Sequence, residues 1–280
     1  MSSFSASDAA LEGFQVIRAQ WRVVLGWCLF SLLSFVGLVV VAFIAIVLAT
    51  LAVATREQAS AAGGVVGGAV FVLGGAGIQL AVLGALYRMG LRPGAPPGLY
   101  YLRFSRDEAR LFALWLTGVA LFAGLMTAGF LALRWLGGLG GPWAGIGTVG
   151  FLALVVWLAL RLSLAGPANV DTGRFGLADS WRLTRRRVWP LLGMVALALC
   201  LLMLIFILLF IVTALIQAAI GGFHTLAPVS LSDPEALAER PGAYVFALIA
   251  ELLIAPVYLV IAQAPFLAAY KALSATPAEA

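Results

Sequence analysis

The sequence predicts an all-α integral membrane protein with six transmembrane helices in three tandem hairpin units, each preceded by a cytoplasmic interfacial amphipathic helix. Three observations carry this prediction. The 280-residue chain is 63% hydrophobic and only 10% charged, whereas soluble domains carry roughly 25% charged residues. Six segments are long and apolar enough to cross a bilayer. Connecting segments rich in lysine and arginine alternate along the chain with segments that hold few of these 17 residues.

The six apolar segments each supply the roughly 20 helical residues that a hydrocarbon core of about 30 Å requires. In chain order they are residues 23–53, 64–87, 111–133, 143–164, 189–220 and 243–270. The first and fifth are the longest, so we expect these two helices to tilt or to project beyond the hydrocarbon core. No stretch with the composition of a soluble domain separates the segments, so residues 1–280 are expected to form a single membrane domain.

The basic residues set the expected orientation. Fourteen of the 17 lysines and arginines lie in the N-terminal segment, the second and fourth connections and the C-terminal tail, and only Arg56, Arg134 and Arg240 lie elsewhere. Connections rich in Lys and Arg stay in the cytoplasm, so both termini are expected there. The densest run, "SWRLTRRRVWPLLG", would anchor the fifth span at the membrane surface, with Trp181 and Trp189 at headgroup depth.

The charged segments resemble one another, which indicates an internal repeat. "RFSRDEARL" (103–111) and "RFGLADSWRL" (174–183) share Arg-Phe and Asp-x-x-Arg-Leu, with one extra residue in the second. The N-terminal segment aligns with the second of these without gaps, and Phe14 then falls on Trp181. The expected repeat units are about 8–88, 103–165 and 174–273. In the first unit one helical face is apolar, as in helices that lie in the membrane interface: Leu11, Phe14, Ile17 and Trp21.

Two segments carry a resemblance to a known family. "LRPGAPPGLYYLRFSRDEARLFAL" and "RLSLAGPANVDTGRFGLADSWRLTRRRVWPLLG" resemble the membrane domain associated with bacterial glycerophosphoryl diester phosphodiesterases, which also occurs alone as six-span inner-membrane proteins. The resemblance implies a multi-pass protein of the bacterial inner (cytoplasmic) membrane. Relatives tend to have glycine in place of Arg186. The phosphodiesterase activity belongs to a separate soluble barrel with a metal-binding His-Arg pair, whereas His224 is followed here by Thr225.

The composition also argues against several functional classes. His224 is the only histidine, and Cys28 and Cys200 lie in separate apolar runs, so we expect no metal site, no cofactor and two reduced thiols. The outer loop around His224 also holds Asp233 and Glu235, but no recognisable nucleophile motif accompanies them. The net charge of +5 does not indicate nucleic-acid binding, because that needs a basic face on a soluble module. A non-enzymatic protein is expected.

Glu251, Gln79 and Gln263 are polar residues inside apolar segments, and they form the first candidate site. An intramembrane carboxylate is a functional hypothesis by default. Residues 252–270 are long enough to span alone, however, so an alternative interpretation places Glu251 at the outer headgroups. Pro256 and Pro265 interrupt the same helix, and broken helices can frame binding sites. Buried glutamines also hydrogen-bond between helices without further function. A Glu251 that faces the interior opposite Gln79 would favour transport.

The cytoplasmic arginines form the second candidate site, for lipid headgroups: Arg174, Arg182, Arg185, Arg186 and Arg187. Anionic headgroups attract each such residue by about 1 kcal/mol near the surface, although anchoring of the topology alone also accounts for the charge. The leading expectation is a protein that binds or organises anionic phospholipid or a partner membrane protein. The alternative is a small-solute or ion transporter or channel that uses Glu251 and the kinked sixth helix.

Two pairs of glycines in the second span indicate a close approach of another helix. Gly63 with Gly67, and Gly64 with Gly68, have the four-residue spacing of small residues at helix–helix contacts in membranes. The contact would lie either within the bundle or between the subunits of a homo-oligomer.

Overall fold

The computed structural model describes residues 5–53, 55–92, 100–103, 105–138, 143–185, 187–221 and 238–275, and these residues contain helices and no strands. The elements are α1 (Ala6–Ala19), α2 (Trp21–Leu51), α3 (Arg56–Leu91), α4 (Arg106–Gly138), α5 (Trp143–Leu162), α6 (Ala165–Thr172), α7 (Leu177–Thr184), α8 (Val188–Gly221) and α10 (Pro241–Ser274). His224, Asp233 and Glu235, from the outer loop, lie outside the described residues, as does Arg186.

Six helical stretches in the described residues are long and apolar enough to cross a membrane, which confirms the predicted number of spans. They follow α2, α3, α4, α5 together with α6, α8 and α10. Several helices extend beyond the apolar segments. For example, α3 begins at Arg56, ahead of the predicted start at residue 64, because Arg, Glu, Gln and Ala are good helix formers that continue a helix into polar surroundings.

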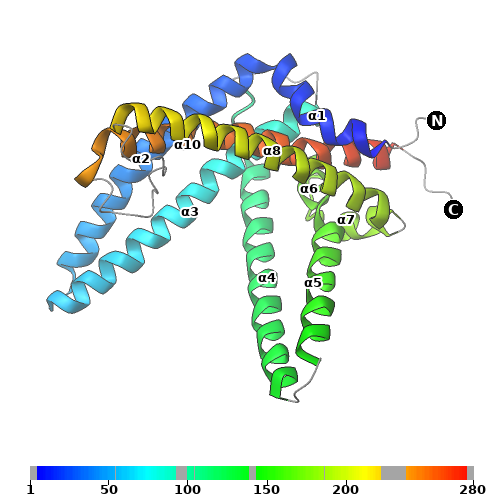
Figure 1. The fold of residues 1–280 in the computed structure, drawn as a ribbon, viewed down its shortest axis with the longest axis horizontal. Coiled ribbons are helices and arrows are strands. Elements are labelled where there is room, and N and C mark those ends of the chain that lie inside the picture. Colours follow the sequence, from blue (N-terminus) through cyan, green and yellow to red (C-terminus); the bar gives the residue numbers. More distant parts are fainter. Residues whose placement is uncertain are drawn as a thin grey trace.

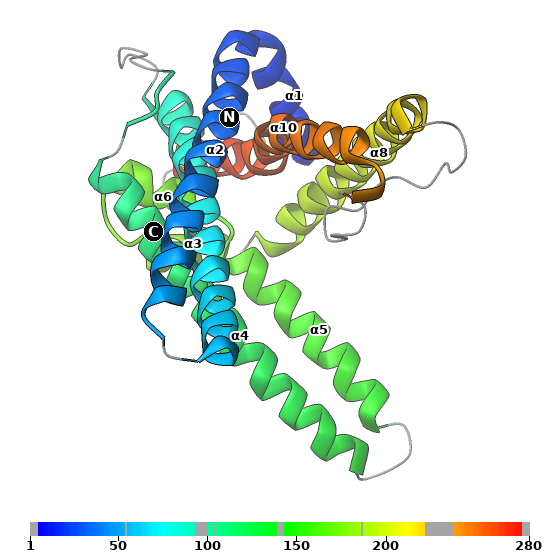
Figure 2. The same cartoon turned by 90° about the vertical axis from the view of Figure 1, so that its left-hand side faces the viewer.

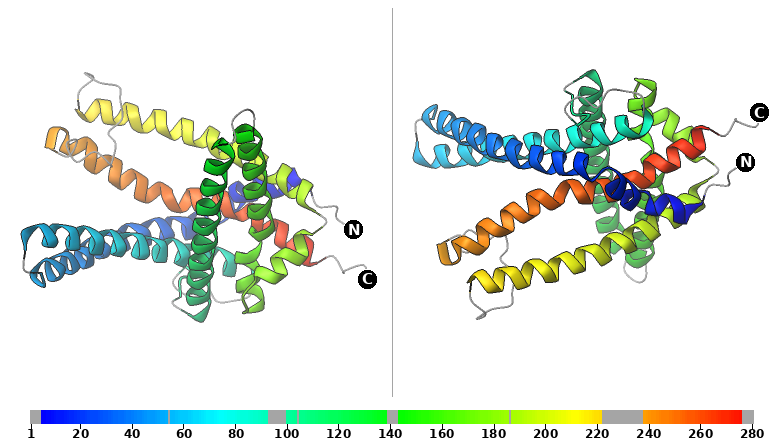
Figure 3. Two further views of the ribbon diagram at one scale, coloured as in Figure 1. Left: turned by 90° about the horizontal axis from the view of Figure 1, so that it is seen from below. Right: turned by 90° about the horizontal axis from the view of Figure 1, so that it is seen from above.

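The long helices form three side-by-side pairs that diverge from one junction (Figures 1 and 2). The pairs are α2 with α3, α4 with α5, and α8 with α10. The short helices α6 and α7 lie at the junction, and α1 crosses the C-terminal half of α10 there (Figure 3). Helix α10 contacts α1, α2, α3, α6 and α8, so it is the element that joins the first and third pairs.

Burial is concentrated at the junction. The largest fully buried side chains include Trp27 near the start of α2, Tyr87 near the end of α3 and Met194 near the start of α8. Away from the junction, the pairs expose large apolar side chains such as Leu51 and Leu204. A contiguous apolar surface of this extent is unfavourable in water and suits contact with lipid chains. The protein is therefore a multi-pass membrane protein whose packed core lies at one end of its spans.

A glycine allows α1 to pack directly on the backbone of α10. A Cβ atom added to Gly13 would lie 2.7 Å from Cα of Ile261, which is closer than any real side chain tolerates. Ile261 is also four residues before Pro265, whose missing N–H leaves the Ile261 carbonyl without its helical hydrogen bond. The two helix axes therefore approach closely where α10 lacks one backbone hydrogen bond.

The two glycine pairs of α3 face different surroundings. Gly63 and Gly67 face Ile46 of α2, so they allow the close packing of the first helix pair. Gly64 and Gly68 have no atom within 4 Å of an added Cβ. The structure thus assigns the first glycine pair to a contact inside the molecule.

The segment before the third span differs from the expectation of a separate helix. Here α4 starts at Arg106 and continues without a break to Gly138. Its start is fixed by Ser105 and Glu108, because the backbone N–H of Ser105 donates to Glu108 Oε2 at 2.7 Å, as in a capping box. In contrast, α1 and α7 are separate helices that end before α2 and α8 begin.

Candidate functional site

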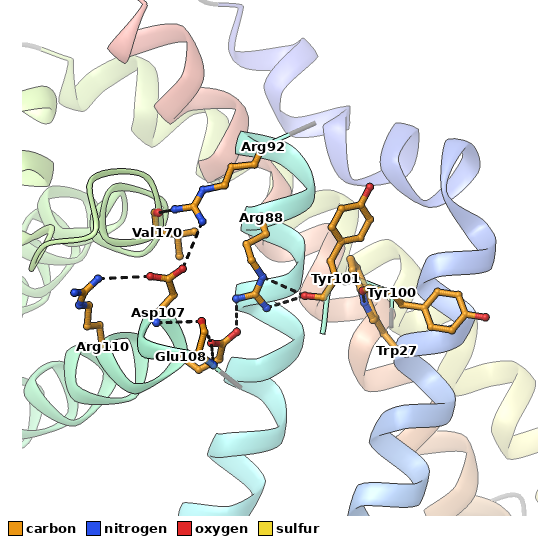
Figure 4. A network of polar contacts seen from close by, with 10 residues as sticks. Trp27, Arg88, Arg92, Tyr100, Tyr101, Asp107, Glu108, Arg110 and Val170 are labelled. Atoms are coloured by element: carbon orange, nitrogen blue, oxygen red, sulfur yellow. Dashed lines mark hydrogen bonds and ion pairs between the residues drawn. The ribbon is translucent and has the colours of Figure 1, made fainter. Parts of the chain in front are cut away.

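A buried ion pair ties α3 to α4 at the junction. Arg88 lies in the last turn of α3, and its guanidinium pairs with the carboxylate of Glu108 (Figure 4). The side chains are only 8% and 10% exposed. Arg88 also donates two hydrogen bonds to the carbonyl of Tyr101, at 2.8 and 3.1 Å. Glu108 in turn accepts from the N–H and hydroxyl of Ser105, so both charges are well compensated.

Tyr100 and Tyr101, which precede α4, are held in a strained conformation by these contacts. Tyr100 and Tyr101 have φ angles of 54° and 63°, a left-handed conformation that costs of order 1 kcal/mol or more per non-glycine residue. The indole N–H of Trp27 donates to the carbonyl of Tyr100 at 2.9 Å, while Arg88 holds the next carbonyl (Figure 4). The Tyr100 ring lies where a side chain at Gly26 would be. These residues form a structural clamp in which every charged group has a partner.

A second polar contact joins α3 and α4 to α6. Asp107 lies 3.6 Å from Arg92 and 3.5 Å from Arg110, and Arg92 also donates to the carbonyl of Val170 at 2.8 Å (Figure 4). Two of the five arginines in the second connection thus contact Asp107, and a third, Arg88, pairs with Glu108. Two carboxylates, those of Asp107 and Glu108, are therefore in ion pairs with three arginines in this region.

Arg161 holds α7 against the end of α5. Its guanidinium carbon lies 5.3 Å and 4.9 Å from the ring centroids of Trp157 and Trp181, and it donates to the carbonyl of Trp181 at 3.1 Å. The hydroxyl of Ser180 completes the contact by donating to the Arg161 carbonyl at 2.7 Å. Cation–π contacts of this kind contribute about 0.5–2 kcal/mol each. Arg161 therefore has a packing role that its sequence position did not reveal.

The arginines predicted to meet lipid headgroups lie at the surface. Arg174, Arg182, Arg185 and Arg187 are exposed. Among the residues that the structure describes, Arg182 pairs with Asp179 at 3.6 Å and the other three form no ion pair. They lie on or beside α7, next to the exposed indoles of Trp181 and Trp189. These four arginines are thus exposed residues within and on either side of α7.

The intramembrane candidates lie in two different places. Glu251 and Gln79 line one cavity of about 780 Å³ between α3, α8 and α10. Gln263 is not among the residues that line this cavity. Its side-chain oxygen accepts a hydrogen bond from the Tyr87 hydroxyl at 3.1 Å, which links α10 to α3. The structure thus joins Glu251 with Gln79 and gives Gln263 the alternative, structural role that the sequence left open.

Two facing helical stripes form the walls of the cavity. The stripe on α8 consists of Phe206, Leu209, Phe210, Thr213 and Gln217. The stripe on α10 consists of Ala247, Ala250, Glu251, Ile254, Ala255, Tyr258, Leu259 and Ala262. Both follow the three- and four-residue spacing of one helix face. The α8 residues were not anticipated from the sequence, although Thr213 and Gln217 are polar residues at that spacing in an apolar span.

Glu251 lies away from both ends of α10. It is 11 residues after Arg240 and 20 residues before Lys271, which corresponds to about 16 Å and about 30 Å along a helix that rises 1.5 Å per residue. Glu251 is exposed and, of the lining residues that belong to the described part of the chain, it alone carries a charge. A volume of this size is typical of sites for drug-sized ligands, which are mostly apolar with a few placed polar groups.

The described residues offer no arrangement for metal binding. No group of three or more His, Cys, Asp or Glu side chains lies together in that part of the chain. Cys28 and Cys200 are free thiols, the first buried and the second exposed. The chemistry available to the cavity is therefore that of one carboxylate, two amides, two hydroxyls and aromatic rings.

Fold and site together define an all-helical, multi-pass membrane protein with a mostly apolar cavity that holds one acidic residue. Comparison with protein families, curated proteins and solved structures finds no match to this chain.

Proposed function

We propose that the chain binds a small molecule in the cavity between α3, α8 and α10, and that it holds or moves this molecule within the bilayer. The observation that supports this proposal is the presence of Glu251 and Gln79 in one cavity. A carboxylate in an apolar span is costly, and such residues usually face a cavity or a substrate pathway. This function corresponds to the transporter or channel that the sequence suggested as its alternative.

The prolines inside helix α10 support movement as well as binding. Pro256 lies between Glu251 and Tyr258 on the same helix that lines the cavity. A proline removes the backbone hydrogen bond to the residue four positions earlier, so α10 bends more easily beside the carboxylate than an uninterrupted helix would. Transporter sites are frequently built where a spanning helix is broken near the membrane midplane.

Filling the cavity should abolish ligand retention. Ala250 lines the cavity, and an Ala250→Trp substitution would place a bulky ring in it. We expect native mass spectrometry of gently extracted wild-type protein to show a retained molecule of defined mass, and the variant to lose it. Ile249→Trp is the matched control, because Ile249 is exposed and is not among the lining residues. Equal spectra for wild type and Ala250→Trp would contradict the proposal.

A second function is supported by the exposed arginines beside α7. Arg174, Arg185 and Arg187 are exposed and lack ion pairs among the described residues, and two exposed tryptophans flank them. We propose that this surface binds anionic phospholipid, as the sequence led us to expect, and that a partner membrane protein is the alternative ligand. The function concerns a different surface from the cavity, so both can hold.

Neutral substitutions at this surface should weaken the preference for anionic lipid. With about 1 kcal/mol for each residue near the surface, we expect Arg185→Gln and Arg187→Gln each to lower the affinity for phosphatidylglycerol about fivefold, with little change for phosphatidylcholine. Lipid retained by the detergent-solubilised protein is the readout. Arg134→Gln, an exposed arginine far from the junction, is the control. Unchanged phosphatidylglycerol affinity in a folded variant that carries both Arg185→Gln and Arg187→Gln would rule out this surface as the lipid-binding site.

The repeat and the orientation also remain proposals. We propose three tandem units at about 8–88, 103–165 and 174–273, with α1, the start of α4 and α7 as their cytoplasmic interfacial segments. Support comes from the positions of the basic residues along the helices: Arg88, Arg161 and Lys271 lie near the C-terminal ends of α3, α5 and α10, whereas Arg134 lies near the C-terminal end of α4 and Arg240 directly precedes α10. Cytoplasmic termini are proposed on the distribution of lysine and arginine along the sequence. A bacterial inner-membrane location and membership of the glycerophosphoryl diester phosphodiesterase membrane-domain family are proposed on the sequence resemblance.

A further inference from the structure

The cavity has the chemistry of a site for an organic cation. Among the residues that the structure describes, Glu251 is the one charged residue that lines it, and these lining residues include no lysine, arginine or histidine. The remaining wall is mostly apolar and contains three aromatic rings, those of Phe206, Phe210 and Tyr258. An anionic ligand would meet a carboxylate with no compensating positive charge, so the wall excludes it on electrostatic grounds.

Two polar groups of the wall, those of Thr213 and Glu251, offer acceptors to a ligand that donates hydrogen bonds or carries positive charge. The hydroxyl of Thr213 donates its single proton within α8, to the carbonyl of Leu209 at 2.8 Å, and the carbonyl of Phe210 lies 3.1 Å away. The hydroxyl therefore presents only its oxygen lone pairs to the cavity. The carboxylate of Glu251 is also an acceptor when ionised. A cationic group in the cavity would interact favourably with the Thr213 oxygen and with the Glu251 carboxylate.

The aromatic rings distinguish an organic cation from a metal ion. Phe206 and Phe210 stack with their centroids 6.2 Å apart, and Tyr258 faces the same cavity from two turns beyond Glu251 on α10. Aromatic faces attract ammonium groups, and aromatic-lined sites bind quaternary ammonium ligands. A hard divalent ion instead needs about six or more oxygen ligands, and this wall offers one carboxylate with a few neutral oxygens.

We propose that the cavity binds a monovalent organic cation with an apolar body, such as an amphipathic amine or quaternary ammonium compound, with Glu251 as its counter-charge and the phenylalanines of α8 against its apolar part. This inference rests on the proposed function and names the class of ligand for the same site. It also predicts a direction of preference, because the sign of the ligand's charge should decide binding when size and shape are equal.

Tetraphenylphosphonium and tetraphenylborate provide that comparison, since they have nearly the same shape and opposite charge. The protein is placed in nanodiscs of zwitterionic phosphatidylcholine, and the binding of each ion is measured by equilibrium dialysis. Empty nanodiscs correct for partitioning into lipid. We expect the wild type to bind the phosphonium at least about tenfold more tightly than the borate. Glu251→Gln should lose about tenfold in phosphonium affinity, whereas Glu251→Asp, which keeps the charge, should lose much less.

The outcomes separate the ligand class from the cavity itself. Equal affinity for the two ions, or an unchanged phosphonium affinity in Glu251→Gln, overturns the cation proposal. If native mass spectra still show a retained molecule that Ala250→Trp abolishes, the cavity remains a binding site for another class of ligand. If phosphonium binding is selective, depends on Glu251 and is blocked in Ala250→Trp but not in Ile249→Trp, the cation proposal is supported.

Discussion

Glu108→Ala is expected to destabilise the protein by about 3–5 kcal/mol, because it leaves the Arg88 guanidinium buried without a counter-charge. The same substitution removes the acceptor that caps the start of α4 at Ser105. Thermal unfolding of the purified protein in detergent is the measurement. A loss of this size corresponds to a decrease in Tm of at least about 6 °C for a chain of this length.

Two control variants separate the buried charge from a general effect of mutation. Asp179→Ala breaks the exposed pair with Arg182, whose side chain is 84% exposed, so it should cost no more than about 1 kcal/mol. Arg88→Met combined with Glu108→Met removes both charges and should recover much of the lost stability, since apolar pairs often replace buried ion pairs well. A Glu108→Ala variant as stable as Asp179→Ala would show that the clamp contributes little.

Gly13→Ala is expected to release α1 from α10. The added methyl group would lie 2.7 Å from Cα of Ile261, and backbone cannot move aside as a flexible side chain can, so the cost is about 1–3 kcal/mol. A detached helix of 14 residues is at best marginally stable in water. Amide hydrogen exchange in residues 6–19 should therefore accelerate at least about tenfold, while exchange in α8 changes little.

The sign of this effect makes the test decisive. Alanine favours a helix over glycine by about 1 kcal/mol, so an α1 that did not pack on α10 would exchange more slowly after the substitution. Gln15→Ala, on the exposed side of the same helix, is the matched control and should leave the exchange rates nearly unchanged. Slower exchange in Gly13→Ala would contradict the observed contact.

The spans could be predicted from the sequence because they depend on local properties. Length and hydropathy define the six apolar helices, and the structure contains six such helices. Helix ends were less predictable. The charged residues before the third span suggested a separate interfacial helix, but good helix formers and the Ser105–Glu108 cap join them to α4. A change in polarity along the chain does not by itself end a helix.

The site was predictable only where single residues were unusual. Glu251 and Gln79 are polar in apolar surroundings, so the sequence singled them out. The partners on α8 were missed, because the location of Phe206 and Gln217 in the same cavity depends on how α8 and α10 face each other. Similarly, Arg88 and Arg161 appeared to be two of many topology-setting arginines. The Arg88–Glu108 pair and the contact of Arg161 with Trp181 are formed between separate helices, with partners 20 residues apart in the chain.

The most direct test of the central claim is a cryo-electron microscopy map of the protein in a lipid nanodisc, extracted without added ligand. We predict α8 and α10 facing each other across a cavity, with Glu251 directed into it and non-protein density beside its carboxylate. A map in which side chains fill the space between α3, α8 and α10, or in which Glu251 points into lipid headgroups, would contradict the proposed site.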